Sequence, residues 1–181
     1  MNLCFDALDR QVIVGRADVP AVVDGSATWT VARLLEEVGA IGGAMRGLGV
    51  EPGSVVGIDV ADPRTRLVAG LAALRLGAVP VLDGPAEAPA LLLVDEAPAA
   101  GATTAPAVLV TGEAPTVVET RDLSLPAALR AGRTDPAPVS EPLPGRPAYV
   151  VGEREVHEPE TGTFLGAALA DLGAGRLVDL R

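Results

Sequence analysis

The stretch from Ala73 to Gly84, ALRLGAVPVLDG, constrains the fold of this chain more than any other. It predicts the end of a helix near Arg75, a glycine turn at Gly77 and a buried strand over 78–82. The apolar run is too short for a helix, and Gly77 can adopt the left-handed conformation that closes one. A helix followed by a glycine and an apolar strand is half of a βαβ crossover, the unit of parallel sheets.

The chain before this stretch predicts alternating helices and strands. Asp24-Gly25 stands between two short apolar runs, which is typical of a hairpin turn. Thr30 and Asp62-Pro63 have the residue types that begin helices. The expected elements, in chain order, are a helix over 2–14, strands over 20–23 and 27–31, a helix over 31–48, a strand over 54–60 and a helix over 63–77.

The longest of these expected helices carries an unusual number of glycines. Gly39, Gly42 and Gly43 each weaken it by about 1 kcal/mol relative to alanine. Small residues on a helix therefore predict close packing against a neighbouring element. Glu36 and Glu37 are expected on its solvent-facing side.

The sequence after Asp83 is richer in proline and alanine, and its elements are shorter. Ser124 is the expected cap of a short helix. The expected elements are strands over 90–94, 107–110 and 116–119, a helix over 123–130, a proline-rich surface connection over 133–147, strands over 148–151 and 154–156, a helix over 161–172 and a strand over 177–180.

Charge and composition exclude several classes of function. The formal net charge is -10, which argues against nucleic acid and anionic membranes as partners. All 14 basic residues are arginine. The absence of lysine excludes mechanisms that need a lysine amine, including a phosphate-loop lysine or a Schiff base. Aromatic residues make up only 2%, so the core must be built from alanine, valine and leucine.

Cys4 is the only cysteine, so no intrachain disulfide can form, and we expect it to act as a small buried apolar residue. The N-terminus carries acids where a secretory signal has a basic region. No apolar run reaches the roughly 18 residues that a membrane-spanning helix needs. We therefore expect a cytoplasmic protein with neither a membrane nor nucleic acid as partner.

Four stretches in the same order resemble one family. They are ALDRQV with the following Gly15-Arg16, PAVVDGSATWTVARLLEEV, LGVEPGSVVGIDVADP and LAALRLGAVPVLDG. Together they resemble the N-terminal portion of the adenylate-forming superfamily of acyl-CoA synthetases, luciferases and peptide-synthetase adenylation domains, closest in style to acetyl- and propionyl-CoA synthetases. The resemblance implies an α/β fold with a mostly parallel sheet flanked by helices. It also implies a relative that makes an acyl-adenylate from ATP and a carboxylic acid.

The resemblance is uneven along the chain. Residues 1–84 match well, 85–146 are eroded and rich in proline and alanine, and 147–181 read as strand, strand and helix. We therefore expect a single truncated domain over 1–181, because the family's chains are well over twice this length. The family's other nucleotide and metal motifs would lie beyond Arg181.

The phosphate-binding loop of the family has no counterpart here. In the family, a strand like Pro147–Val151 leads into a Gly/Ser/Thr loop that ends in Pro-Lys-Gly, and a strand with Val-His follows. Val156-His157 resembles that second strand, yet only Gly152–Glu155 stands between the two. A phosphate cradle needs several flexible glycines whose N–H groups converge on one anion, beside hydroxyl and cationic groups. Two glutamates and one arginine have the wrong sign for a triphosphate, and a solvated hairpin turn accounts for them.

We assign no catalytic residue, no metal ligand and no cofactor from the sequence. His157 is the only histidine, and no Cys–His pair has metal-binding spacing. The candidates for lining a ligand pocket are Asp83, Tyr149, Arg154 and His157.

The sequence favours a degenerate, non-catalytic relative of the acyl-CoA synthetases that acts as a binding or assembly partner. A second copy of the chain or another protein chain is the expected partner. The alternative is a fragment that binds AMP or an acyl ligand, or a subunit of a split adenylate-forming ligase. A third reading is a folded remnant without a selected role.

Overall fold

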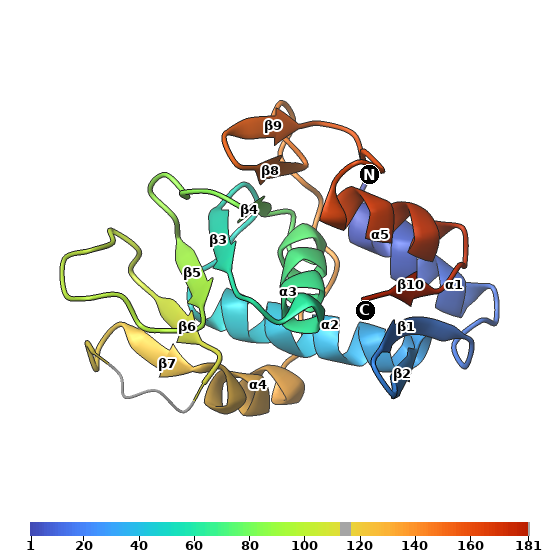
Figure 1. Ribbon diagram of the computed structural model, residues 1–181, viewed down its shortest axis with the longest axis horizontal. Coiled ribbons are helices and arrows are strands. Elements are labelled where there is room, and N and C mark those ends of the chain that lie inside the picture. The colour runs from blue at the N-terminus through green and yellow to red at the C-terminus, as the bar shows by residue number, and fades with distance from the viewer. Residues whose placement is uncertain (113–116, 181) are drawn as a thin grey trace.

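The computed structural model describes residues 1–112 and 117–180, which form two sheets and the helices around them (Figure 1). The large sheet has seven strands in the order β7-β6-β5-β3-β4-β8-β9. Every neighbouring pair in it is parallel except β8 and β9. Its strands are β3 (Val55–Asp59), β4 (Val79–Leu82), β5 (Leu91–Val94), β6 (Val108–Val110), β7 (Asp122–Ser124), β8 (Tyr149–Val151) and β9 (Arg154–Val156). The expectation of a mostly parallel α/β sheet is confirmed.

A small second sheet, ordered β10-β1-β2, joins the two ends of the chain. Its strands are β1 (Pro20–Asp24), β2 (Ala27–Thr30) and β10 (Val178–Asp179). The helices are the π-helical η1 (Phe5–Asp9), α1 (Arg10–Ile13), α2 (Val31–Gly47), α3 (Pro63–Arg75), α4 (Leu125–Thr134) and α5 (Phe164–Gly173). Thr30, Asp62, Ser124 and Thr163 each accept a hydrogen bond from the backbone N–H three residues on. The expected caps Thr30, Asp62 and Ser124 are therefore confirmed, and the last helix begins at Phe164 rather than at 161.

The stretch from Ala73 to Gly84 lies at the centre of this arrangement. Gly77 has a φ of +69°, and a Cβ there would lie 2.7 Å from the carbonyl oxygen of Glu141. The strand that follows, β4, is fully buried between β3 and β8. Gly77 therefore serves both as the left-handed end of α3 and as a point of close approach.

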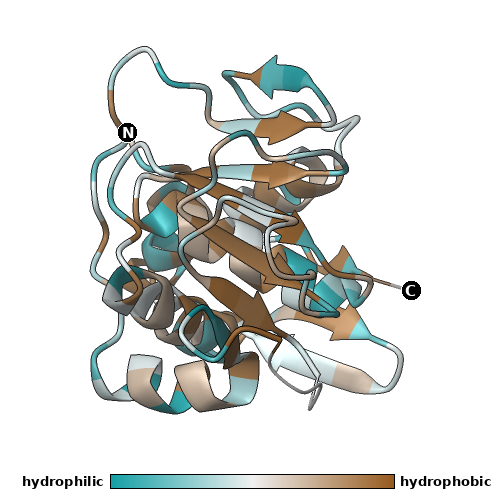
Figure 2. Cartoon of the chain, turned by 90° about the vertical axis from the view of Figure 1, so that its left-hand side faces the viewer, coloured by the Kyte–Doolittle hydropathy of each residue, from teal (hydrophilic) through white to brown (hydrophobic). Residues whose placement is uncertain are grey.

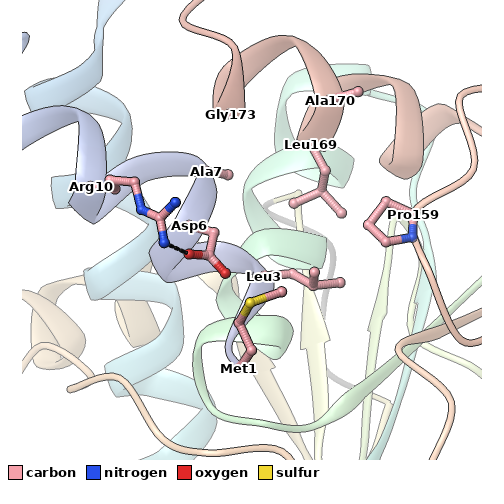
Figure 3. Close-up of a pocket in the computed structure, with 9 residues that line it drawn as sticks. All are labelled: Met1, Leu3, Asp6, Ala7, Arg10, Pro159, Leu169, Ala170 and Gly173. Atoms are coloured by element: carbon pink, nitrogen blue, oxygen red, sulfur yellow. Dashed lines mark hydrogen bonds and ion pairs between the residues drawn. The ribbon is translucent and has the colours of Figure 1, made fainter.

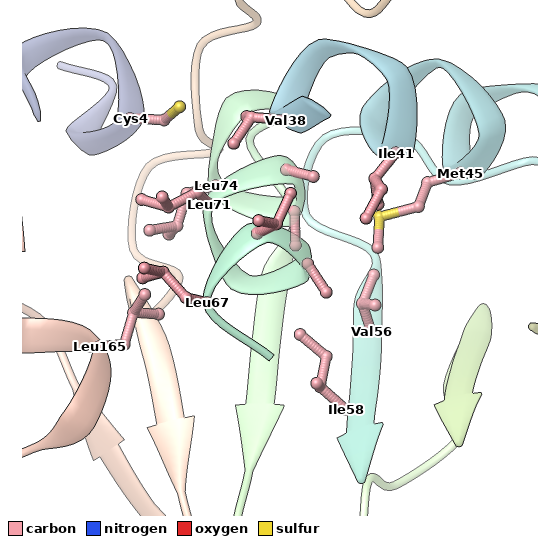
Figure 4. Packing of buried hydrophobic residues seen from close by; sticks show 14 of the residues in the cluster. Cys4, Val38, Ile41, Met45, Val56, Ile58, Leu67, Leu71, Leu74 and Leu165 are labelled. Atoms are coloured by element: carbon pink, nitrogen blue, oxygen red, sulfur yellow. The ribbon is translucent and has the colours of Figure 1, made fainter. Parts of the chain in front are cut away.

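One face of the large sheet packs against α2, α3 and α4, where the main hydrophobic core lies (Figure 4). Val56 and Ile58 of β3 point toward α3 and the end of α2. Leu67 and Leu71 of α3 are fully buried on the side of that helix that faces Leu165 of α5 and Cys4 of the N-terminal segment. The core consists almost entirely of alanine, valine and leucine, as the composition predicts. Figure 2 shows the opposite face of the sheet, crossed mainly by loops.

Helices α2 and α4 cross in backbone contact. A Cβ on Gly43 would lie 2.8 Å from the carbonyl oxygen of Gly132 in α4 and 2.3 Å from that of Asp135 just after it. The prediction that small residues on α2 mark a close neighbour is confirmed. A related prediction was wrong: Glu37 is buried rather than on the solvent-facing side. Because α4 covers it, its carboxylate is paired with Arg33 at 2.6 Å and with Arg133 at 2.8 Å.

The prediction of a strand over 116–119 is also wrong for residues 117–119, which do not form a strand. Thr116 lies outside the described residues. The backbone N–H groups of Val117 and Val118 donate to the carboxylate of Asp122 at 2.9 and 2.8 Å, so they are not free to pair with a strand. The strand in this part of the chain is β7, which begins three residues later, at Asp122. A hydrogen bond from Arg121 lowers the pKa of the Asp122 carboxyl.

The proline-rich connection begins later than expected, and it is packed more closely against the helices than the expected surface connection. Helix α4 extends to Thr134, and the chain that follows is tied to two helices. The N–H of Ala137 donates to the carbonyl oxygen of Gly39 in α2, and the N–H of Ser140 donates to that of Arg75 in α3. The side chain of Arg75 returns a hydrogen bond to the carbonyl oxygen of Ala137 at 2.8 Å. The connection therefore helps to hold α2 and α3 together.

Cys4 is fully buried, as expected, and burial raises the pKa of its thiol to about 12. Because the thiolate is the reactive form, we expect Cys4 to resist alkylation by iodoacetamide at pH 8 in the folded protein. Mass spectrometry should detect the adduct only after denaturant is added. Rapid labelling of the native protein would contradict the burial.

Candidate functional site

Ligands of open parallel sheets bind at the carboxyl ends of the strands. Here β4 and β8 lie side by side, with Leu82 opposite Val151, and both end at this edge. The N–H of Gly152, just after β8, donates to the carbonyl oxygen of Leu82 at 2.8 Å. A Cβ on Gly84 would lie 2.6 Å from the carbonyl oxygen of Gly152. The two strand exits are therefore in direct backbone contact.

The connection between β8 and β9 is a two-residue turn. Val151 pairs with Arg154, which leaves only Gly152 and Glu153 at the tip. Gly152 has a φ of +64°, the conformation that such hairpin turns require. The tight turn expected from the sequence is confirmed. It offers one glycine and one carboxylate where a phosphate cradle needs several converging N–H groups and a cation.

The carboxyl edge is acidic. Five acids lie at or just after the ends of β3, β4, β5 and β8: Asp59, Asp62, Asp83, Asp95 and Glu153. Two of these carboxylates have structural roles. Asp62 caps α3, and Asp95 accepts hydrogen bonds at 2.7 Å from the N–H of Ala61 and from the hydroxyl of Thr111. This concentration of carboxylates repels an anionic ligand.

Asp83, the first of the sequence-predicted pocket residues, lies at this edge directly after β4. It has a φ of +58°, a conformation uncommon for a residue with a side chain. Its carboxylate is half-exposed and paired with Arg66 of α3. The guanidinium of Arg66 also lies 5.2 Å from the centre of the Phe164 ring. Arg66, a cation near this edge of β4, is thus already engaged by Asp83.

Tyr149 and Arg154 lie in a different cluster, between the β8–β9 hairpin and α5. The Tyr149 ring is fully buried. Its hydroxyl lies 2.9 Å from that of Thr163, the cap of α5, and accepts a hydrogen bond from the N–H of Glu160 at 3.0 Å. Arg154 is paired with the carboxylate of Glu160 at 2.6 Å. This cluster holds the hairpin against the start of α5.

His157 follows β9, beside the start of β8 and so at the opposite end of that strand from Gly152. It is exposed and lies 3.6 Å from the carboxylate of Glu155. With Arg146 it lines a hollow of about 660 Å³ beneath the proline-rich connection. The structure therefore does not bring the four predicted pocket residues together. It joins Tyr149 to Arg154 through Glu160 and leaves Asp83 and His157 apart.

A second hollow, of about 310 Å³, lies between the N-terminal helix and α5 (Figure 3). Its walls are mostly apolar and include Leu3, Pro159 and Leu169. Asp6 on its edge is paired with Arg10, and the Oδ2 atom of Asp6 has no hydrogen-bond partner among the described residues. Sequence reasoning did not identify this hollow, because its two walls come from opposite ends of the chain.

Neither a metal centre nor a membrane span is found in the part of the chain that the structure describes. No group of three or more His, Cys, Asp or Glu side chains there is placed to hold a metal ion. Within residues 1–112 and 117–180, every helix is too short or too polar to cross a bilayer.

The parallel sheet, its helices and the edge formed by β4 and β8 define an α/β protein built like the N-terminal portion of adenylate-forming enzymes. A family model described as AMP-binding enzyme matches residues 8–151. The chain therefore belongs to the AMP-binding enzyme family.

Among solved structures, the chain is similar to a crystal structure of the anthranilate CoA ligase AuaEII in complex with anthranoyl-AMP. The TM-score is 0.57 and the sequence identity 21%, over 79% of this chain and 30% of that one. At this identity the likeness concerns the fold, and the chain spans less than a third of the ligase's length. A comparison with curated proteins found no match.

Proposed function

We propose that this chain is a non-catalytic member of its family and acts as a binding or assembly partner, in the cytoplasm. The two-residue turn Gly152-Glu153 carries the proposal. Adenylate formation requires the triphosphate of ATP to be held and its charge neutralised. A turn with one glycine and one carboxylate supplies neither enough N–H donors nor a positive charge.

Two further observations support a role without nucleotide chemistry. The exits of β4 and β8 are in backbone contact, with Gly84 packed on Gly152, so a loop between β8 and β9 has no room to fold back over β4. The sequence also contains no lysine. Arg66, the cation beside β4, is held by Asp83 and would have to leave that carboxylate to meet a phosphate.

The test is titration calorimetry with Mg-ATP and AMP, together with ATP–pyrophosphate exchange by the isolated chain. We expect no binding tighter than about 1 mM, which corresponds to roughly 4 kcal/mol, and no exchange. An active acyl-CoA synthetase run in parallel shows that the exchange assay works. Micromolar ATP binding or measurable exchange would overturn the proposal.

The partner is a second copy of the chain or a different protein. Size-exclusion chromatography with light scattering distinguishes a homo-oligomer from a monomer. A monomer at high concentration that also fails to bind any partner would count against an assembly role.

The alternative is a fragment or a split-ligase subunit that binds AMP or an acyl ligand. The observation that supports it is the hollow of about 660 Å³ that Arg146 and His157 line. A volume of this size suits a small ligand. Calorimetry with an acyl-CoA would favour this alternative if it showed binding that Arg146→Ala weakens at least about tenfold.

A further inference from the structure

The small sheet has a free strand edge. Its order is β10-β1-β2, so β2 has β1 on one side and, in the part of the chain that the structure describes, no strand on the other. In Figure 1 the β1–β2 hairpin lies at the margin of the molecule. An edge strand presents unpaired N–H and C=O groups, and natural proteins commonly protect such edges with charged residues or proline. The edge of β2 is therefore a candidate surface for another strand.

The composition of β2 differs from that of the other strands at sheet edges. Within residues 1–112 and 117–180, those strands are β7, β9 and β10. Each contains at least one charged residue: Asp122 in β7, Arg154 and Glu155 in β9, and Asp179 in β10. The sequence of β2 is Ala-Thr-Trp-Thr, which contains neither a charged residue nor a proline. This edge thus lacks the usual protection against pairing with another strand.

The hairpin turn determines which backbone groups of β2 face outward. Asp24 pairs with Ala27 across the two-residue turn Gly25-Ser26. Hydrogen-bonded and non-hydrogen-bonded pairs alternate along an antiparallel ladder, and the pair that closes a two-residue turn is hydrogen-bonded. The next pair, Val23 with Thr28, is therefore non-hydrogen-bonded. The N–H and C=O of Thr28 consequently point away from β1, toward the free edge.

Trp29, the only tryptophan of the chain, lies on the same strand. Its side chain is half-buried, and the guanidinium carbons of Arg64 and Arg33 lie 5.0 and 5.7 Å from the centre of its ring. Tryptophan and arginine are enriched among the residues that contribute most to protein interfaces. Arg64 is paired with Asp24, and Arg33 is paired with Glu37 at 2.6 Å. Each of these cations is therefore balanced by a carboxylate beside the strand.

We propose that two copies of this chain associate through β2, with the two strands antiparallel about a two-fold axis at Thr28. The inference rests on the proposed function as an assembly partner, and it names both the surface and the partner. Thr28 of one copy lies opposite Thr28 of the other, and the two residues exchange both backbone hydrogen bonds. In this register Trp29 lies opposite Ala27 of the second copy.

This register is self-complementary. The large ring of Trp29 meets the small side chain of Ala27, and threonine pairs are favourable across antiparallel strands. The charges beside β2 are paired within each copy, so the contact does not depend on a partner of opposite charge. A two-fold contact requires a surface that matches itself, as this edge does. Because an edge of four residues is a small interface, we expect a dissociation constant on the order of 10–100 μM.

Sedimentation equilibrium of the full chain from about 5 to about 500 μM measures this association. We expect a monomer–dimer equilibrium within that range. The fluorescence of Trp29 is a second readout, since its ring packs on the second copy in the dimer. Its emission maximum should move to shorter wavelength as the protein concentration rises. A chain that stays monomeric at the highest concentration would overturn the proposal.

Two variants at one position test the register. Thr28→Glu and Thr28→Arg each place like charges opposite one another across the axis, which should weaken self-association at least about fivefold at low salt. An equimolar mixture of the two variants places glutamate opposite arginine and should dimerise about as tightly as the parent. Only a contact that sets position 28 against itself predicts this recovery.

Thr161→Glu is the matched control, because Thr161 is also exposed and lies outside the small sheet. It should change self-association less than about twofold. Thr28 is exposed as well, so all three variants should keep the unfolding midpoint of the parent. Equal weakening by Thr28→Glu and Thr161→Glu would overturn the contact. So would a mixture of Thr28→Glu and Thr28→Arg that stays monomeric.

None of these results depends on ATP. A chain that stays monomeric and does not bind ATP leaves the proposed function with a different protein as partner, and only the β2 contact is removed. Micromolar binding of ATP by a chain that dimerises as described overturns the proposed function and leaves the β2 contact standing.

Discussion

Replacing Gly132 by alanine is expected to lower the free energy of unfolding by about 3 kcal/mol. Gly132 lies in α4 where that helix crosses α2. A Cβ there would lie 1.9 Å from the carbonyl oxygen of Ala40 and 2.8 Å from the backbone nitrogen of Ala44. Because these are backbone atoms of a helix, no side chain can rotate away, and the two helices must separate. Urea unfolding followed by circular dichroism measures the loss.

The matched control is Gly47→Ala at the end of α2, where a Cβ would meet nothing within 4 Å. Helix propensity favours alanine over glycine by up to about 1 kcal/mol, so this variant should be as stable as the parent or slightly more stable. Propensity alone predicts the same sign at both positions. A Gly132→Ala variant as stable as the parent would therefore contradict the close crossing of α2 and α4.

The second large effect is expected at Tyr149. Tyr149→Ala removes a fully buried ring and should cost about 4 kcal/mol, within the range for large-to-small aromatic substitutions. Its hydroxyl is hydrogen-bonded to the hydroxyl of Thr163 and to the N–H of Glu160. The alanine variant therefore also loses the hydrogen bonds that hold the β8–β9 hairpin against the start of α5. Thermal and urea unfolding both report the change.

Tyr149→Phe separates the two contributions. It keeps the ring and removes the hydroxyl, which takes the acceptor from the partly buried N–H of Glu160, at a cost of about 1 kcal/mol. If Tyr149 instead serves chiefly to contact a ligand, both variants should unfold close to the parent. Equal stability of all three proteins would thus argue for the pocket role predicted from the sequence.

Local features could be predicted because the residues that determine them are neighbours in the chain. Thr30, Asp62 and Ser124 cap helices with their own side chains, and Gly77 adopts the left-handed conformation that its place after α3 requires. The two-residue turn at Gly152 was predictable for the same reason, since no other segment can lengthen it.

The errors lie where a distant element decides the outcome. Glu37 is buried because α4 crosses α2 over it and brings Arg133 to its carboxylate. The segment 117–119 is not a strand because the carboxylate of Asp122 takes its N–H groups. Neither partner is visible in the local pattern of the sequence.

The sequence by itself determined the α/β class, most of the elements and their caps, and the turn at Gly152-Glu153 that replaces a phosphate loop. Only the tertiary structure decided which candidate residues meet. It joined Tyr149 to Arg154 through Glu160 and placed Asp83 and His157 apart, and it brought loops over one face of the sheet. The physical reason is the distance along the chain over which each feature is determined. Caps and turns depend on neighbouring residues, whereas a pocket depends on how separate elements pack.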